Sequence, residues 1–198
     1  FLALAAIGLH ELWRVRTAPR RLLRGAAVVL LVALGQLALP GYPVARADAN
    51  ADYLLGLRLA RRGDHERAVQ IFERSLSRDP ALADAWHGIG VARSEQGRWE
   101  DAVRAYREAL ARNPRSTWTE YNLGLCLERL GRAEEAVAAF ERAAALDPRS
   151  AEIRARLGVL LARLGRPGEA VEQLRAALAI DPRHALAQAE LTRLLRER

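Results

Sequence analysis

The sequence repeats with a period of 34 residues, and this period constrains the fold more than any other feature. Five sets of equivalent residues recur in phase over four consecutive copies. The sets are Gly56, Gly90, Gly124 and Gly158; Gly63, Gly97, Gly131 and Gly165; Ala68, Ala102, Ala136 and Ala170; Phe72, Tyr106, Phe140 and Leu174; and Pro80, Pro114, Pro148 and Pro182. Such a period is typical of a solenoid, because one small unit cannot bury its apolar face alone but several stacked units can.

The second copy carries the most complete version of the pattern. It reads Trp86-His-Gly-Ile-Gly90, then Gly97-Arg-Trp-Glu-Asp-Ala102, then Tyr106, Ala109 and Pro114. This is similar to the W-x2-L-G…A-x3-F…P pattern of the tetratricopeptide (TPR) family. The other copies depart from it in places, since Ser75 replaces a small Ala and Leu174 replaces an aromatic residue.

The TPR resemblance implies an all-α fold, a helix-turn-helix solenoid of four repeats followed by a capping helix. The repeats are expected at 49–82, 83–116, 117–150 and 151–184, and the capping helix at 185–198. A glycine inside a helix costs up to about 1 kcal/mol relative to Ala, so the mid-helix glycines indicate close approach of another helix. A proline after Asp or Asn ends each repeat, because the residue before proline disfavours the helical conformation.

The first 45 residues predict transmembrane helices that precede the solenoid. Residues 1–13 are apolar and short, and we interpret them as the end of a first span. Residues 25–45 carry no charge over 21 positions, which is enough for a second span. The loop at 14–24 holds five Arg and no acid. Because Arg-rich loops stay in the cytoplasm, the repeats are expected on the other side of a bacterial inner membrane, in the periplasm.

A cleaved signal peptide is the alternative for this region. An Arg-rich start, an apolar core at 26–39 and the tripeptide Ala45-Arg46-Ala47 also fit cleavage after Ala47. Both interpretations place the repeats outside the cytoplasm. The chain contains no Met, so we expect Phe1 to lie inside a longer protein.

The basic charge follows the apolar segments rather than the repeats. Residues 1–47 hold six Arg and one Glu, a charge of +5, whereas residues 48–198 account for only +2 of the total of +7. We therefore expect no nucleic-acid partner.

The four His residues are scattered and no catalytic or phosphate-binding motif is present, which predicts a protein that is not an enzyme and has no cofactor or metal. Cys126 is expected to be a buried packing residue.

Family resemblance places the binding surface on the inner face of the first helix of each repeat, where a protein or peptide partner is expected. The candidate groove residues are Tyr53, Leu57, His87, Val91, Trp118, Tyr121, Asn122, Leu125, Arg156 and Val159. Large aromatic side chains are common interface anchors. We expect removal of Trp118 and Tyr121 to weaken binding with little effect on folding, and Trp99 to serve packing.

Some TPR proteins hold a C-terminal carboxylate with a clamp of two Lys, two Asn and one Arg. Only Asn122 and Arg156 match that pattern, while His87, Val91 and Glu152 occupy the other positions. The sequence therefore predicts no such clamp.

The order of parts resembles the Bat-type aerotolerance proteins of bacteria, in which a von Willebrand A domain precedes a membrane segment and TPR repeats. This resemblance implies a membrane-anchored scaffold for protein–protein interaction. Two alternatives stay open: a cytochrome c maturation factor with periplasmic TPRs, and the TPR tail of a polytopic glycosyl-transfer enzyme.

Overall fold

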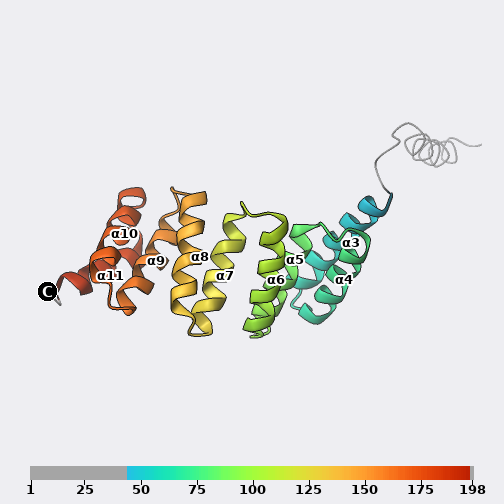
Figure 1. Cartoon of the computed structure of the whole chain (residues 1–198), viewed down its shortest axis with the longest axis horizontal. Helices are drawn as coiled ribbons and strands as arrows, with labels where there is room; N and C mark the ends of the chain where they lie inside the picture. The colour runs from blue at the N-terminus through green and yellow to red at the C-terminus, as the bar shows by residue number, and fades with distance from the viewer. Residues whose placement is uncertain (1–43, 197–198) are drawn as a thin grey trace, which may run out of the picture. The chain divides into compact units, whose positions relative to one another are not determined.

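The computed structural model describes residues 44–196, with side chains from Ala47 onward, and these residues are entirely helical apart from turns. The described helices lie in one compact unit, residues 45–198, except that α3 begins one residue before it. Its helices follow one another in chain order from α3 to α11 (Figure 1). They are α3 (Val44–Arg61), α4 (His65–Arg78), α5 (Ala83–Glu95), α6 (Trp99–Arg112), α7 (Thr117–Arg129), α8 (Ala133–Leu146), α9 (Ala151–Arg163), α10 (Pro167–Ile180) and α11 (Ala185–Arg196).

The helix bounds repeat with the period of the sequence. The first helices α5, α7 and α9 begin at residues 83, 117 and 151, and the second helices α6, α8 and α10 begin at 99, 133 and 167, so each step is 34 residues. Neighbouring helices pack in order, and α5 also contacts α7 across the intervening second helix. The all-α repeat solenoid expected from the sequence is confirmed for the described residues.

The turn within each repeat depends on a glycine with positive φ. Gly63, Gly97, Gly131 and Gly165 have φ of 81°, 72°, 73° and 73°. This left-handed conformation is readily adopted only by glycine, so the chain reverses after each first helix at a fixed residue. Asp or Asn then caps the end of each second helix, and its side chain accepts a hydrogen bond from the backbone N–H two residues later, as between Asp147 and Arg149 at 3.1 Å.

The mid-helix glycines of the first helices face the large side chain of the second helix. A Cβ atom at Gly90 would lie 2.5 Å from Tyr106, and one at Gly124 would lie 2.8 Å from Phe140. Tyr106 and Phe140 are 1% and 0% exposed, so they fill the centre of each repeat. The close approach expected from the sequence is confirmed.

The predicted membrane segments at 1–13 and 25–45 and the loop at 14–24 lie outside the described residues, except that α3 begins at Val44. None of the described helices combines the length and the apolar character needed to cross a membrane.

Candidate functional site

The first helices α5, α7 and α9 share one hollowed face, which we call the groove. Its larger hollow has a volume of about 610 Å³. It is lined by Val91, Ser94, Glu95, Gln96, Gly97, Trp99, Tyr106, Asn122, Leu125, Cys126, Arg129 and Arg156. Four of the predicted groove residues are therefore brought together here: Val91 from α5, Asn122 and Leu125 from α7, and Arg156 from α9.

A second hollow of about 410 Å³ adjoins the first at the carboxyl ends of α7 and α9. It is lined by Leu125, Glu128, Arg129, Arg156 and Arg163, and three of these residues also line the larger hollow. Arg163 donates to Glu128 at 2.6 Å. The guanidinium of Arg129 instead lies over the ring of Trp99, 5.8 Å from its centroid. This end of the groove is therefore rich in guanidinium groups.

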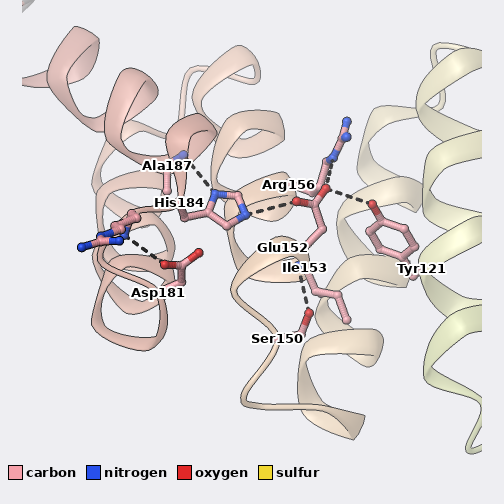
Figure 2. Close-up of polar contacts among 9 residues, drawn as sticks. Tyr121, Ser150, Glu152, Ile153, Arg156, Asp181, His184 and Ala187 are labelled. Atoms are coloured by element: carbon pink, nitrogen blue, oxygen red, sulfur yellow. Dashed lines mark hydrogen bonds and ion pairs between the residues drawn. The ribbon is translucent and has the colours of Figure 1, made fainter.

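The other end of this face carries a polar network centred on Glu152 of α9 (Figure 2). One carboxylate oxygen accepts from the Tyr121 hydroxyl at 3.1 Å and from Nε of Arg156 at 2.8 Å. The other lies 3.1 Å from Nε2 of His184, which directly precedes α11. Nδ1 of His184 in turn accepts from the backbone N–H of Ala187. The network links α7, α9 and α11.

The charges of this network are set by their neighbours. Partial burial disfavours ionisation of Glu152, but the hydrogen bond and charge of Arg156, together with the hydrogen bonds to Tyr121 and His184, outweigh it and lower the pKa of the carboxyl. Burial, with the nearby Glu152 carboxylate, raises the pKa of the Tyr121 hydroxyl, which stays protonated and donates. Arg156 is therefore already engaged, and the absence of a carboxylate clamp stays a prediction.

The predicted aromatic anchors differ in how much they contribute to the core. Trp118 is 70% exposed and meets Tyr121 edge-on at 6.2 Å between ring centroids. Tyr121 also packs on Phe140 of α8, and Tyr53 packs on Phe72 of α4, with centroid separations of 5.8 and 5.9 Å. The expectation that truncation leaves folding intact therefore applies to Trp118 and needs correction for Tyr121, because its ring covers the core.

His87 is likewise half-buried between repeats. Its ring packs on Tyr106, and Nδ1 lies 2.9 Å from the buried hydroxyl of Thr119. Burial lowers the pKa of His87 although Asp84 opposes the shift, so the ring is neutral at pH 7. His87 thus offers a neutral aromatic surface rather than a charge.

Three further candidates lie apart from the hollows. Tyr53 and Leu57 of α3 belong to the cluster around Phe72, and Val159 of α9 is half-buried.

Cys126 is 2% exposed, and burial raises the pKa of its thiol to about 11, as suits a packing residue. Within the described part of the chain, no group of three or more His, Cys, Asp or Glu side chains is placed to hold a metal ion. The absence of a cofactor and of catalysis stays a prediction.

Two residues of the groove have a larger part than the sequence indicates. Trp99 is expected to serve packing, and it does pack on the core, but it also walls the larger hollow. Family resemblance places Arg129 on the inner face of its first helix, although it is not one of the ten candidate groove residues. The sequence does not show that Arg129 lies over Trp99 of the preceding repeat, because only the stacking of the helices brings these two residues together.

Comparison with protein families matches two tetratricopeptide repeat models, one over residues 87–151 and 121–185 and the other over residues 47–115. The chain belongs to the tetratricopeptide repeat family. The matches cover the repeats identified from the 34-residue period. A comparison with curated proteins finds no match.

Solved structures of TPR proteins share the fold. The crystal structure of MamA superposes with a TM-score of 0.69 at 21% identity, over 72% of this chain and 83% of that one. PilF of Pseudomonas aeruginosa gives a TM-score of 0.67 at 28% identity, over 77% of this chain and 70% of that one. MamA from Desulfovibrio magneticus RS-1, residues 41 to the end, gives a TM-score of 0.63 at 23% identity, over 69% of this chain and 77% of that one. This TPR solenoid is a scaffold suited to protein–protein interaction.

Proposed function

We propose that this protein is a scaffold that binds a segment of a partner protein in the groove over α5, α7 and α9. The observation that carries the proposal is the continuous hollow lined by Val91, Leu125 and Trp99, with four predicted groove residues at its wall. Shape and composition support it, since an apolar floor with a few polar groups at its edge is the usual form of a binding site.

Trp118 is the second support for this function. An indole that is 70% exposed gives little to folding, whereas tryptophan is strongly enriched among the residues that dominate binding energy. Trp118 lies on α7, the helix that also supplies Asn122 and Leu125 to the hollow. A partner that follows the groove would therefore meet it.

The test is a comparison of Trp118→Ala with Ile180→Ala, which removes another exposed apolar side chain at the end of α10. Proteins captured from a membrane extract of the source bacterium are quantified for both variants. We expect Trp118→Ala to lower capture of the specific partner about thirtyfold, because an anchor contributes about 2 kcal/mol. Ile180→Ala should retain it. Equal capture by the two variants would place the interface elsewhere.

We further propose that the scaffold is anchored in a bacterial inner membrane with its repeats in the periplasm. The support is the uncharged stretch at 25–45 and the basic loop at 14–24. An alkaline phosphatase fusion after Arg198 should be active, since that enzyme matures only outside the cytoplasm. Activity of a cytoplasmic reporter alone at that site would contradict this topology.

A Bat-type aerotolerance role is the finer proposal, supported by the order of apolar segment and TPR repeats. It requires a von Willebrand A domain with an Asp-x-Ser-x-Ser motif in the reading frame upstream of Phe1. Further apolar spans there would favour the glycosyl-transfer enzyme instead, and loss of c-type cytochromes on deletion would favour the maturation factor.

A further inference from the structure

The guanidinium-rich end of the groove contains one arginine, Arg129, that forms no ion pair among the described residues. The smaller hollow is lined by Arg129, Arg156 and Arg163 against one carboxylate, Glu128. Arg163 pairs with Glu128 at 2.6 Å and Arg156 pairs with Glu152 at 2.8 Å. Among the residues that the structure describes, Arg129 has no carboxylate at ion-pair distance. Glu95 also lines the larger hollow, but no ion pair joins it to Arg129. The guanidinium of Arg129 is therefore without an ion-pair partner at the shared edge of the two hollows.

Arg129 is exposed, and its position is set by contact with an aromatic ring. Its guanidinium lies over Trp99, and an arginine stacked on an aromatic ring keeps its N–H groups directed outward in the plane of the guanidinium. A carboxylate is the group that these planar donors match best. Next to it, Val91 and Leu125 form an apolar wall.

Asn122 indicates the conformation of the ligand. Its side chain lines the larger hollow, and within residues 47–196 its amide makes no hydrogen bond. An amide pairs well with the backbone N–H and C=O of an extended segment, whereas a helix already satisfies these groups internally. The groove is thus better matched to an extended segment than to a helix.

We propose that the groove recognises an extended acidic-apolar segment of the partner, in which an Asp or Glu side chain pairs with Arg129 and an adjacent aliphatic side chain fills the hollow between Val91 and Leu125. This inference rests on the proposed function and names the chemistry of its partner. A side-chain carboxylate is favoured over a chain terminus, because the clamp positions of the family are occupied here by His87, Val91 and Glu152. A single unpaired guanidinium matches a single carboxylate.

The probe is a library of random dodecapeptides displayed by their carboxyl ends on phage, so that only internal carboxylates are offered. The library is panned on the full 198-residue chain in mild detergent, and enriched peptides are synthesised with blocked termini. We expect them to share an acidic residue near an aliphatic one. Changing that acid to its amide, or Arg129→Gln in the protein, should each weaken binding about tenfold. The two changes together should cost little more than one.

The matched control is Arg175→Gln, which removes an exposed arginine on α10, outside the groove helices. It should leave affinity unchanged. Arg129→Glu should reverse the preference, so that a peptide with Arg in place of the acid binds better than the parent. Thermal melting of each variant separates lost binding from lost folding.

The outcomes distinguish this inference from the proposed function. Leu125→Ala probes the groove without touching charge. If it weakens binding while the acid-to-amide change does not, the acidic specificity is wrong and the groove function stands. If neither Leu125→Ala nor Arg129→Gln has an effect, or no peptide is enriched, both proposals fail. If a free carboxyl terminus restores binding to the amide peptide, the carboxylate comes from a chain end and the side-chain assignment is overturned.

Discussion

Each repeat is centred on one glycine and one large side chain that depend on each other. The Phe140 ring fills space that would belong to a Cβ atom at position 124, and Tyr106 does the same opposite Gly90. In the fourth repeat, Leu174 takes the place of the aromatic residue and still lies 2.7 Å from the Cβ that Gly158 lacks. The packing therefore requires a missing side chain on one helix more than it requires an aromatic ring on the other.

This dependence predicts that Gly124→Ala destabilises the protein although alanine is the better helix former. The new Cβ would meet Phe140 at 2.8 Å, and forced overpacking costs about 1–3 kcal/mol. Gly168→Ala is the control, since a Cβ there has no atom within 4 Å and helix propensity should make it neutral or slightly stabilising. Denaturant unfolding measures both. If the two substitutions have the same effect, the glycine is not needed for close approach.

At the scale of the element, the first helix of each repeat contacts the second helix through the residue at position 86 or its equivalent, position 120. The type of contact differs between these two repeats. Trp86 lies under Arg112 with its ring centroid 5.1 Å from the guanidinium carbon. One repeat later, Glu120 pairs with Arg142 at 2.7 Å. The Glu120 side chain is 6% exposed and its Oε2 has no hydrogen-bond partner. A hollow of about 420 Å³ lies beside it, between α6, α7 and α8.

We therefore predict that Glu120→Trp raises the free energy of unfolding by about 1 kcal/mol. It removes a buried, half-satisfied carboxylate, and replacing a buried ion pair with a well-packed apolar group is often stabilising. The indole would also extend into the adjacent hollow and offer Arg142 a ring to lie on. Glu120→Ala is the comparison. It should lower the free energy of unfolding, because alanine removes the ion pair with Arg142 and does not fill the hollow. If urea unfolding shows a lower free energy of unfolding for the tryptophan variant than for wild type, the Glu120–Arg142 ion pair stabilises the repeat more than the indole does.

For the solenoid as a whole, the ends differ from the middle because each repeat is covered only by its neighbours. Leu55 of α3 is 39% exposed, although its equivalents Leu123 and Leu157 are 3% and 2% exposed. Leu195 of α11 is 49% exposed, whereas its equivalent Leu161 is 2% exposed. The helix α11 is therefore the least supported element at the carboxyl end, and His184 joins it to Glu152.

His184→Ala should loosen α11 without disturbing the centre of the array. The substitution removes the acceptor for the Ala187 N–H and the contact with Glu152, which together are worth about 1–2 kcal/mol. Hydrogen–deuterium exchange should rise about tenfold in α11 and stay unchanged in α5. Arg183→Ala, at the adjacent position, is the control. Faster exchange throughout the solenoid would show that the repeats unfold as one unit.

The sequence by itself determined the repeat, the helix pairs and their turns, because each depends on local chemistry. Glycines at a fixed spacing allow the left-handed turn, and Asp-Pro or Asn-Pro pairs end each second helix. Family resemblance added the face of the first helices on which the groove is expected, and four of its candidates, Val91, Asn122, Leu125 and Arg156, line the larger hollow.

Only the tertiary structure decided what each groove residue is free to do. Trp118 and Tyr121 look equivalent in the sequence, yet one is exposed and the other covers Phe140 and donates to Glu152. Arg156 and Arg129 look alike as well, yet of these two only Arg129 keeps an unpaired charge among the described residues. Stacking brings Tyr121 to Glu152 and Arg129 to Trp99, each pair about one repeat apart, whereas Arg156 pairs with Glu152 on its own helix. The 34-residue period carries no information about which of these contacts will form.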